Sequence, residues 1–139
     1  MNKKTNRQCS GLFLRMNDDQ NEKMREYTIS GNKKDGAYLS NQVREFISCD
    51  KSALYVSSAV EEMIVHIVDM NDDLEWIDVI IRYNGEYTVI SMKYSGIGYN
   101  TNDDSNFNCE NTGILSSISD SIDNSQILGL NNIVMTIKM

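Results

Sequence analysis

The stretch from Ser52 to Met70, SALYVSSAVEEMIVHIVDM, constrains the fold more than any other part of the chain. Its apolar residues recur at steps of three and four, which places them on one broad face of an α-helix. The residues of this face are Val56, Ala59, Val60, Met63, Ile64, Ile67 and Val68. On another face Glu62 and His66 lie one helical turn apart. Such a helix either packs on a core with an acidic edge in water or contributes this polar pair to a site.

The neighbouring segments predict strands and further helices. Trp76–Tyr83 and Glu86–Lys93 are rich in β-branched residues, and Asn84-Gly85 between them is a strong hairpin signal. The other predicted elements are strands at 9–16, 25–30 and 133–138, a helix at 36–48 with Asp35 as its N-cap, a helix at 53–70 and a short helix at 113–121. Residues 101–112 are rich in Asn and Asp and predict a loop.

This order of elements predicts an α+β fold. We expect a two-layer α/β sandwich, with a mostly antiparallel, mixed sheet and the helices on one face. A chain of 139 residues is long enough to bury a core, so residues 1–139 are expected to form a single domain. Residues 1–24 are then an N-terminal extension or an extra strand. The face bearing Val56, Val60, Met63 and Ile67 is expected to be the core seam.

Charge and cysteine content argue against several classes of function. The formal net charge is −7, whereas nucleic-acid binding needs clustered Lys and Arg. No apolar run approaches the ~20 residues of a membrane span, and no signal peptide is visible. Three cysteines far apart indicate reduced thiols, and a single histidine without a Cys-x-x-Cys pair argues against zinc. We therefore expect a cytoplasmic protein that binds neither nucleic acid nor, by itself, membranes.

Four motifs carry a resemblance to a known family. They are Ala59–Met63 with its acidic pair, Tyr94-Ser95-Gly96-Ile97-Gly98 after the hairpin, Thr112–Leu115, and Leu128–Asn132 before the last strand. From about Arg25 to its end, the chain resembles the histidine-kinase-like ATP-binding domain of the GHKL superfamily. It is most similar to the small bacterial anti-sigma-factor serine kinases and to related domains appended to larger proteins. The order and spacing of the four motifs are more specific than any one motif.

The resemblance implies a role for each matching residue. It gives Glu62 the position of the general base and His66 the position of an Asn that ligates Mg²⁺. Nucleotide-binding positions fall on His66, Tyr94, Gly96, Gly98 and Gly113. Two of these residues depart from the family. Imidazole is a poor ligand for Mg²⁺, which prefers oxygen, and Tyr94 replaces an Asp that pairs with the adenine amino group. The motif at Thr112–Leu115 matches the second glycine-rich motif of the family but contains fewer glycines, because Asn111 and Thr112 stand where glycines are frequent.

Three interpretations follow. The first is a degenerate domain with an impaired ATP site and no cofactor, which acts as a regulatory module. Its partner would be a regulatory protein, such as a sigma factor or an anti-anti-sigma-like protein, or a second copy in a homodimer. The second is an active serine/threonine kinase or ATPase that uses ATP and Mg²⁺, with Glu62 as base. The third is a structural domain whose motifs match by chance. Locally, Gly96 and Gly98 can serve a tight turn, and the Tyr94 ring is expected to fill the vacated adenine pocket.

Overall fold

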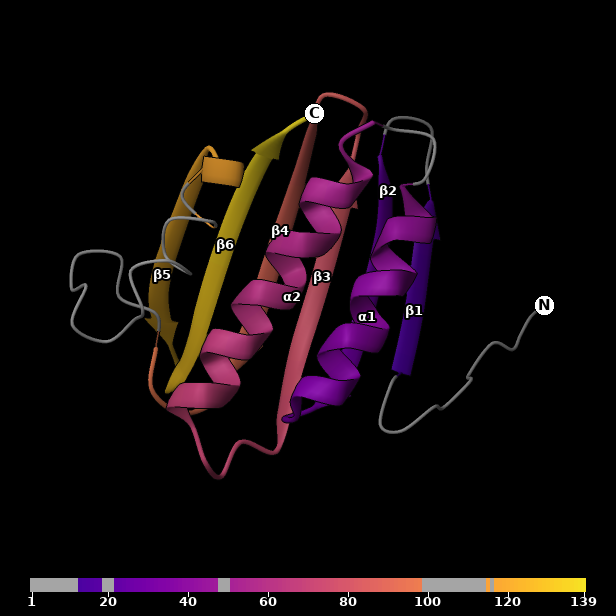
Figure 1. Ribbon diagram of the computed structural model, residues 1–139. Helices are drawn as coiled ribbons and strands as arrows, with labels where there is room; N and C mark the ends of the chain where they lie inside the picture. Colours follow the sequence, from indigo (N-terminus) through magenta and orange to yellow (C-terminus); the bar gives the residue numbers. More distant parts are fainter. Residues whose placement is uncertain (1–12, 19–21, 48–50, 99–114, 116) are drawn as a thin grey trace.

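Two helices pack on one face of an antiparallel sheet (Figure 1). The computed structural model describes residues 13–18, 22–47, 51–98, 115 and 117–139. The strands are β1 (Phe13–Asp18), β2 (Lys23–Ser30), β3 (Trp76–Tyr83), β4 (Tyr87–Tyr94), β5 (Ser121–Ile127) and β6 (Leu130–Lys138). The helices are α1 (Lys33–Phe46) and α2 (Ala53–Met70). Within the described residues, six strands form one sheet in the order β1-β2-β3-β4-β6-β5.

Every strand pairing among the described residues is antiparallel. The predicted α+β architecture, with two layers and helices on one face, is therefore confirmed, but the expected mixed sheet is wrong. The reason is the helical hairpin between β2 and β3. Because α1 and α2 run in opposite directions, the chain enters β3 beside the end of β2, where Ser30 pairs with Trp76. No parallel crossover results.

The core lies between the helices and the sheet. Each central strand turns alternate side chains towards the helices, and these residues are buried. The predicted helix face is confirmed as the seam, since Val56, Val60, Met63 and Ile67 are all fully buried. The two helices approach closely at Gly36, where a Cβ atom would lie 2.7 Å from Cγ2 of Ile64. A glycine is therefore needed at this crossing.

Helix α1 begins earlier than predicted. Its N-cap is Asn32, whose side chain accepts a hydrogen bond from the Asp35 amide at 2.8 Å. The expectation that Asp35 is the cap is therefore wrong. Asp35 is instead buried in the first turn, and its carboxylate accepts hydrogen bonds from the amide and hydroxyl of Ser30 at the end of β2. The acid thus joins the helix to the sheet.

Two differences concern the last third of the chain. The sequence analysis assigned no strand to residues 121–127, which form the edge strand β5. The short helix expected at 113–121 is wrong at its end, because Ser121 already belongs to β5; Gly113 and Ile114 lie outside the described residues. The hairpin at Asn84-Gly85 is confirmed. The Asn84 Oδ1 atom accepts hydrogen bonds from the amides of Glu86 and Tyr87, at 2.8 and 2.9 Å.

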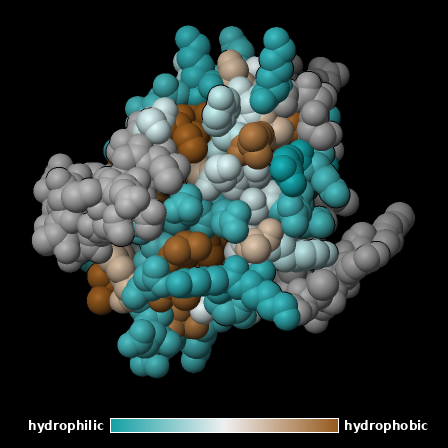
Figure 2. Space-filling view, viewed as in Figure 1, coloured by the Kyte–Doolittle hydropathy of each residue, from teal (hydrophilic) through white to brown (hydrophobic). Residues whose placement is uncertain are grey.

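The outer faces of the helices are mostly solvated. Figure 2, drawn from the helix side, shows largely hydrophilic side chains with hydrophobic ones in separate patches. Leu54 and Tyr55 at the start of α2 are exposed. Among the described residues, no helix is long and apolar enough to cross a membrane.

Candidate functional site

Of the residues singled out by the resemblance, Tyr94, Gly96 and Gly98 lie where α2 ends, β4 ends and β6 begins (Figure 1). Tyr94, the last residue of β4, is fully buried and belongs to the core between helices and sheet. Its hydroxyl donates a hydrogen bond to the carbonyl of Ile97 at 2.8 Å. The phenol ring therefore lies beneath the glycine-containing loop that follows β4, and its polar tip is bonded to that loop.

Asn71, the C-cap of α2, holds the same loop from the helix side. Its Oδ1 accepts the Ile97 amide at 2.6 Å, and its Nδ2 donates to the Ile97 carbonyl at 3.2 Å. The same Nδ2 group also donates to the carbonyl of Ile67 at 2.9 Å. One amide side chain thus binds both backbone polar groups of Ile97 and ties them to the last turn of the helix.

Asn131 holds the loop from the sheet side. This buried residue of β6 donates from Nδ2 to the Gly96 carbonyl at 2.5 Å. Its Oδ1 accepts from Nε2 of Gln126 on β5, at 3.3 Å. A buried amide is stable only when its donors and acceptors are matched, and here the loop backbone supplies one partner.

The two glycines make these contacts possible. Gly96 has a φ of +133°, and a Cβ atom on it would collide with Oδ1 of Asn71. At Gly98 a Cβ atom would lie 2.5 Å from Oδ1 of Asn131 and 2.7 Å from Nδ2 of Asn124. Side-chain amides therefore occupy the space above both glycines, which gives each glycine a packing reason independent of any phosphate.

Glu62 and His66 lie on α2, before the Asn71 cap. Glu62 is half-buried and His66 is buried, so the helix turns the imidazole inwards more than the carboxylate. Gly113 lies outside the described residues. Within the part of the chain that the structure describes, no cluster of three His, Cys, Asp or Glu residues could hold a metal ion.

A shallow depression of about 410 Å³ opens beside the loop. Its lining residues are Met70, Asn71, Asp72, Asp73, Leu74, Ser95, Gly96 and Ile97. The two aspartates are exposed. Their charge disfavours a polyphosphate at this position unless a cation accompanies it.

The sequence analysis missed Asn71 and Asn131 as functional neighbours of the glycine loop. Their partners lie 26 and 35 residues away in the sequence, so no local pattern marks them. A weak signal existed for Asn131, which belongs to the motif Leu128–Asn132. For Asn71, a position directly after a long helix indicated only a turn.

No family model matches the chain, and no curated protein matches it. The family resemblance therefore depends on the motifs themselves.

Proposed function

We propose that this protein is a non-catalytic regulatory module with a histidine-kinase-like fold, which acts by binding another protein. The observation that carries the proposal is the position of Tyr94. The resemblance gives this position to an Asp that pairs with the adenine amino group. In this chain the Tyr94 ring is buried, and its hydroxyl donates a hydrogen bond to the loop that follows it.

The loop contacts support an impaired nucleotide site. An adenine ring entering beneath the loop would displace the Tyr94 ring and break its hydrogen bond to Ile97. An unpaired buried polar group costs ~1–3 kcal/mol, and adenine would find no carboxylate in return. His66 at the Mg²⁺ position adds a further loss, because the charge of the triphosphate would be less well compensated beside Glu62. Since each 1.4 kcal/mol is tenfold in affinity, a micromolar site would become millimolar or weaker.

The architecture supports the fold assignment. The two-layer arrangement brings the end of α2, the loop after β4 and the start of β6 together, and two of the four quoted motifs, Tyr94–Gly98 and Leu128–Asn132, lie in these segments. A regulatory protein, such as a sigma factor or an anti-anti-sigma-like protein, is the class of partner that the resemblance implies. The net charge of −7 favours a partner with a basic surface.

Calorimetric titration of ATP, with and without Mg²⁺, tests the nucleotide part of this proposal. We expect no binding in the micromolar range under either condition. Micromolar binding of ATP with Mg²⁺ would overturn the proposal and favour an active kinase or ATPase with Glu62 as its base.

Two variants sharpen the titration. The double change His66→Asn with Tyr94→Asp restores the two family residues, and its fold is checked by circular dichroism. Tyr94→Phe is the matched control, because it keeps the ring and removes the hydroxyl that donates a hydrogen bond to Ile97. Binding by the double variant alone would assign the loss to these two positions. Binding by neither would assign part of the loss to the Asn71 and Asn131 contacts.

A further inference from the structure

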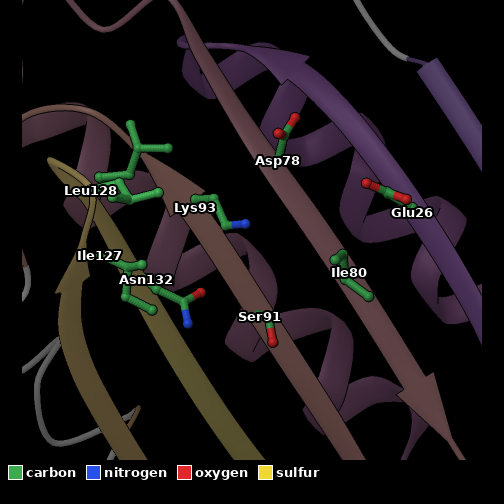
Figure 3. Close-up of a pocket in the computed structure, with 9 residues that line it drawn as sticks. Glu26, Asp78, Ile80, Ser91, Lys93, Ile127, Leu128 and Asn132 are labelled. Carbon is green, nitrogen blue, oxygen red and sulfur yellow. The ribbon is translucent and has the colours of Figure 1, made fainter.

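A hollow of about 280 Å³ lies on the sheet face opposite the helices, here called the open face. The open face is formed by the alternate strand residues that point away from α1 and α2. Figure 3 shows the Lys93 side chain between the apolar β5–β6 turn and the carboxylate of Asp78. The volume of the hollow is close to the lower limit of ~300 Å³ for ligand pockets, so an occupant would be a small molecule.

Asp78 and Lys93 carry opposite charges at directly paired positions of β3 and β4. Among the described residues, no ion pair joins their side chains. The Asp78 carboxylate instead accepts a hydrogen bond at 2.6 Å from the hydroxyl of Thr28, its partner on β2. Because Asp78 is half-buried and Lys93 is exposed, a positive and a negative group lie on neighbouring strands, and both can be reached from the hollow.

Lys93 also has neutral polar neighbours. Asn132 is its direct partner on β6, and Ser91 lies two positions before it on the same face of β4. The amide and the hydroxyl can each donate a hydrogen bond to an anion. A carboxylate bound at Lys93 would therefore combine a charge-assisted contact with these neutral donors.

The charges around the hollow argue against a phosphate and against a simple amine. Glu26 lies on the β2 side, so the described lining residues carry two carboxylates and one ammonium. The excess of carboxylates disfavours a phosphate, and the Lys93 charge disfavours an amine that has no carboxylate of its own. A molecule that carries both an ammonium and a carboxylate is complementary to both signs.

The β5–β6 turn supplies the apolar end of the hollow. Leu128 is 97% exposed and Ile127 is 55% exposed. Leu128 also has a φ of +54°, a conformation that Asn or Gly tolerates better, so neither the turn nor the core explains a leucine here. Backbone strain of this kind is often retained where a residue serves a function. An aliphatic group bound in the hollow would cover part of these two side chains.

We propose that the hollow binds a small aliphatic α-amino acid of the leucine type. Its carboxylate contacts Lys93, its ammonium contacts Asp78, and its side chain lies against Ile127 and Leu128. In an α-amino acid the two charged groups share one carbon atom, which suits two charged side chains on adjacent strands about 4.8 Å apart. The hollow shares no described lining residue with the depression beside the glycine loop, and the proposal does not depend on the nucleotide site.

Titration of L-leucine into the full chain, followed through the amide resonances by NMR, tests the proposal. We expect shifts centred on Ser91, Lys93 and Asn132 that saturate with a Kd of roughly 1 mM or below. Two analogues separate the charges, because isoamylamine lacks the carboxylate and isocaproate lacks the ammonium. Each should bind at least about tenfold more weakly than leucine. Equal binding of either analogue would overturn the zwitterionic site.

Substitutions locate the site on the sheet. Lys93→Met removes the charge and keeps a long side chain, and Asp78→Asn removes the charge and keeps the shape. Each should weaken leucine binding at least about tenfold. Lys138→Met, the matched control, makes the same change at an exposed position of the open face outside the hollow and should leave binding unchanged. Circular dichroism checks that each variant is folded. Undiminished binding by both charge variants would overturn the proposal.

Three further outcomes of the titration count against the site. Leucine at about 10 mM that causes no saturable shift would exclude binding. Shifts confined to the helices or to the glycine loop would place a ligand elsewhere. Shifts of open-face resonances that follow protein concentration without leucine would show that a second copy covers this face. Each of these results would overturn the proposal.

Discussion

The two faces of the sheet are built from alternate residues of the same strands, yet they differ in almost every property. The central strands bury their helix-side residues, most of which are aliphatic, as at Val79, Ile90 and Met135. The open face mixes Asp78 and Lys93 with small and aliphatic residues that remain half-exposed. Because neighbouring residues point to opposite faces, each face can be changed with little effect on the other.

The two faces therefore contribute differently to the stability of the fold. The helix-side face determines which elements pack together, and most of the free energy of folding comes from its burial. The open face contributes less to folding, so its charges and sizes are available to specify a contact. The predictions below test this division, beginning with the largest expected effect.

The same truncation on the two faces should have very different costs. Ile67→Ala removes a fully buried side chain of α2 and should lower the free energy of unfolding by about 2–5 kcal/mol. Ile80→Ala, on the half-exposed open face, should cost no more than about 1 kcal/mol. Urea denaturation gives both values. Equal losses would show that the open face belongs to the folding core.

Alkaline pH should weaken the helix-side face through Tyr27 of β2. Burial raises the pKa of Tyr27 from 10.0 to about 12, while the Arg25 charge lowers it and the Glu45 charge raises it to smaller extents. Below pH 10 the phenol is protonated in both states, so its contribution is fully present. As the pH rises towards 12, the unfolded chain ionises first and about 2–3 kcal/mol of stability is lost.

Denaturation of the natural chain and of Tyr27→Phe across this pH range measures the effect. The variant lacks the titrating group, so its stability should fall less steeply. Identical pH profiles for the two proteins would contradict the assignment.

The glycine loop can be tested with a matched pair of substitutions. Gly96 and Gly85 both have positive φ, but a Cβ atom at Gly96 would collide with Asn71, whereas nothing lies within 4 Å at Gly85. Gly85→Ala should therefore cost only the backbone strain, about 1 kcal/mol. Gly96→Ala should cost about 1–2 kcal/mol more, because the Asn71 bonds to Ile97 are also disturbed. Thermal denaturation of both variants gives the difference, and equal costs would remove the proposed role of Asn71.

The β5–β6 turn holds a branched residue at positive φ, where Asn is better tolerated. Leu128→Asn should therefore stabilise the chain by about 0.5–1 kcal/mol. Urea denaturation of the variant and of the natural chain measures the difference. A variant that is less stable than the natural chain would show that the exposed Leu128 side chain contributes more than its backbone conformation costs.

The smallest effect is expected on the outer helix surface. Asp69 forms an ion pair with Lys33 at 2.6 Å, and both side chains are more than half exposed. Water screens such pairs, so Asp69→Ala should change the free energy of unfolding by at most about 0.5 kcal/mol. Chemical denaturation of Asp69→Ala and of Ile67→Ala compares the free energies of unfolding for changes on the outer and the inner face of α2.

The sequence predicted the elements whose signals are local. Helix α2 has an uninterrupted apolar repeat, and its predicted bounds at 53–70 agree with the structure. The β3–β4 hairpin depends on its own turn residues. Helix α1 was placed three residues late because Asn32 and Asp35 both resemble caps, and only the contact of Asp35 with Ser30 of β2 distinguishes them. That contact is tertiary.

The remaining features depend on distant contacts. Strand β5 has the sequence SIDNSQI, with no regular alternation of apolar residues, because an edge strand packs little of its surface on the core. The partners of Asn71 and Asn131 become visible only when α2, β4 and β6 are assembled. The motifs placed Tyr94, Gly96 and Gly98 together after the hairpin, but the side chains that surround the glycine loop were not predictable from spacing.

The bond from the Ile97 amide to Asn71 has a consequence for hydrogen exchange. The Ile97 side chain is 57% exposed and its residue lies outside any strand, so its amide would ordinarily exchange quickly with solvent. Here Oδ1 of Asn71 accepts that amide proton, and the proton exchanges only when the loop leaves the helix. Its exchange rate therefore reports the opening of this one loop, separately from the unfolding of the sheet beneath it.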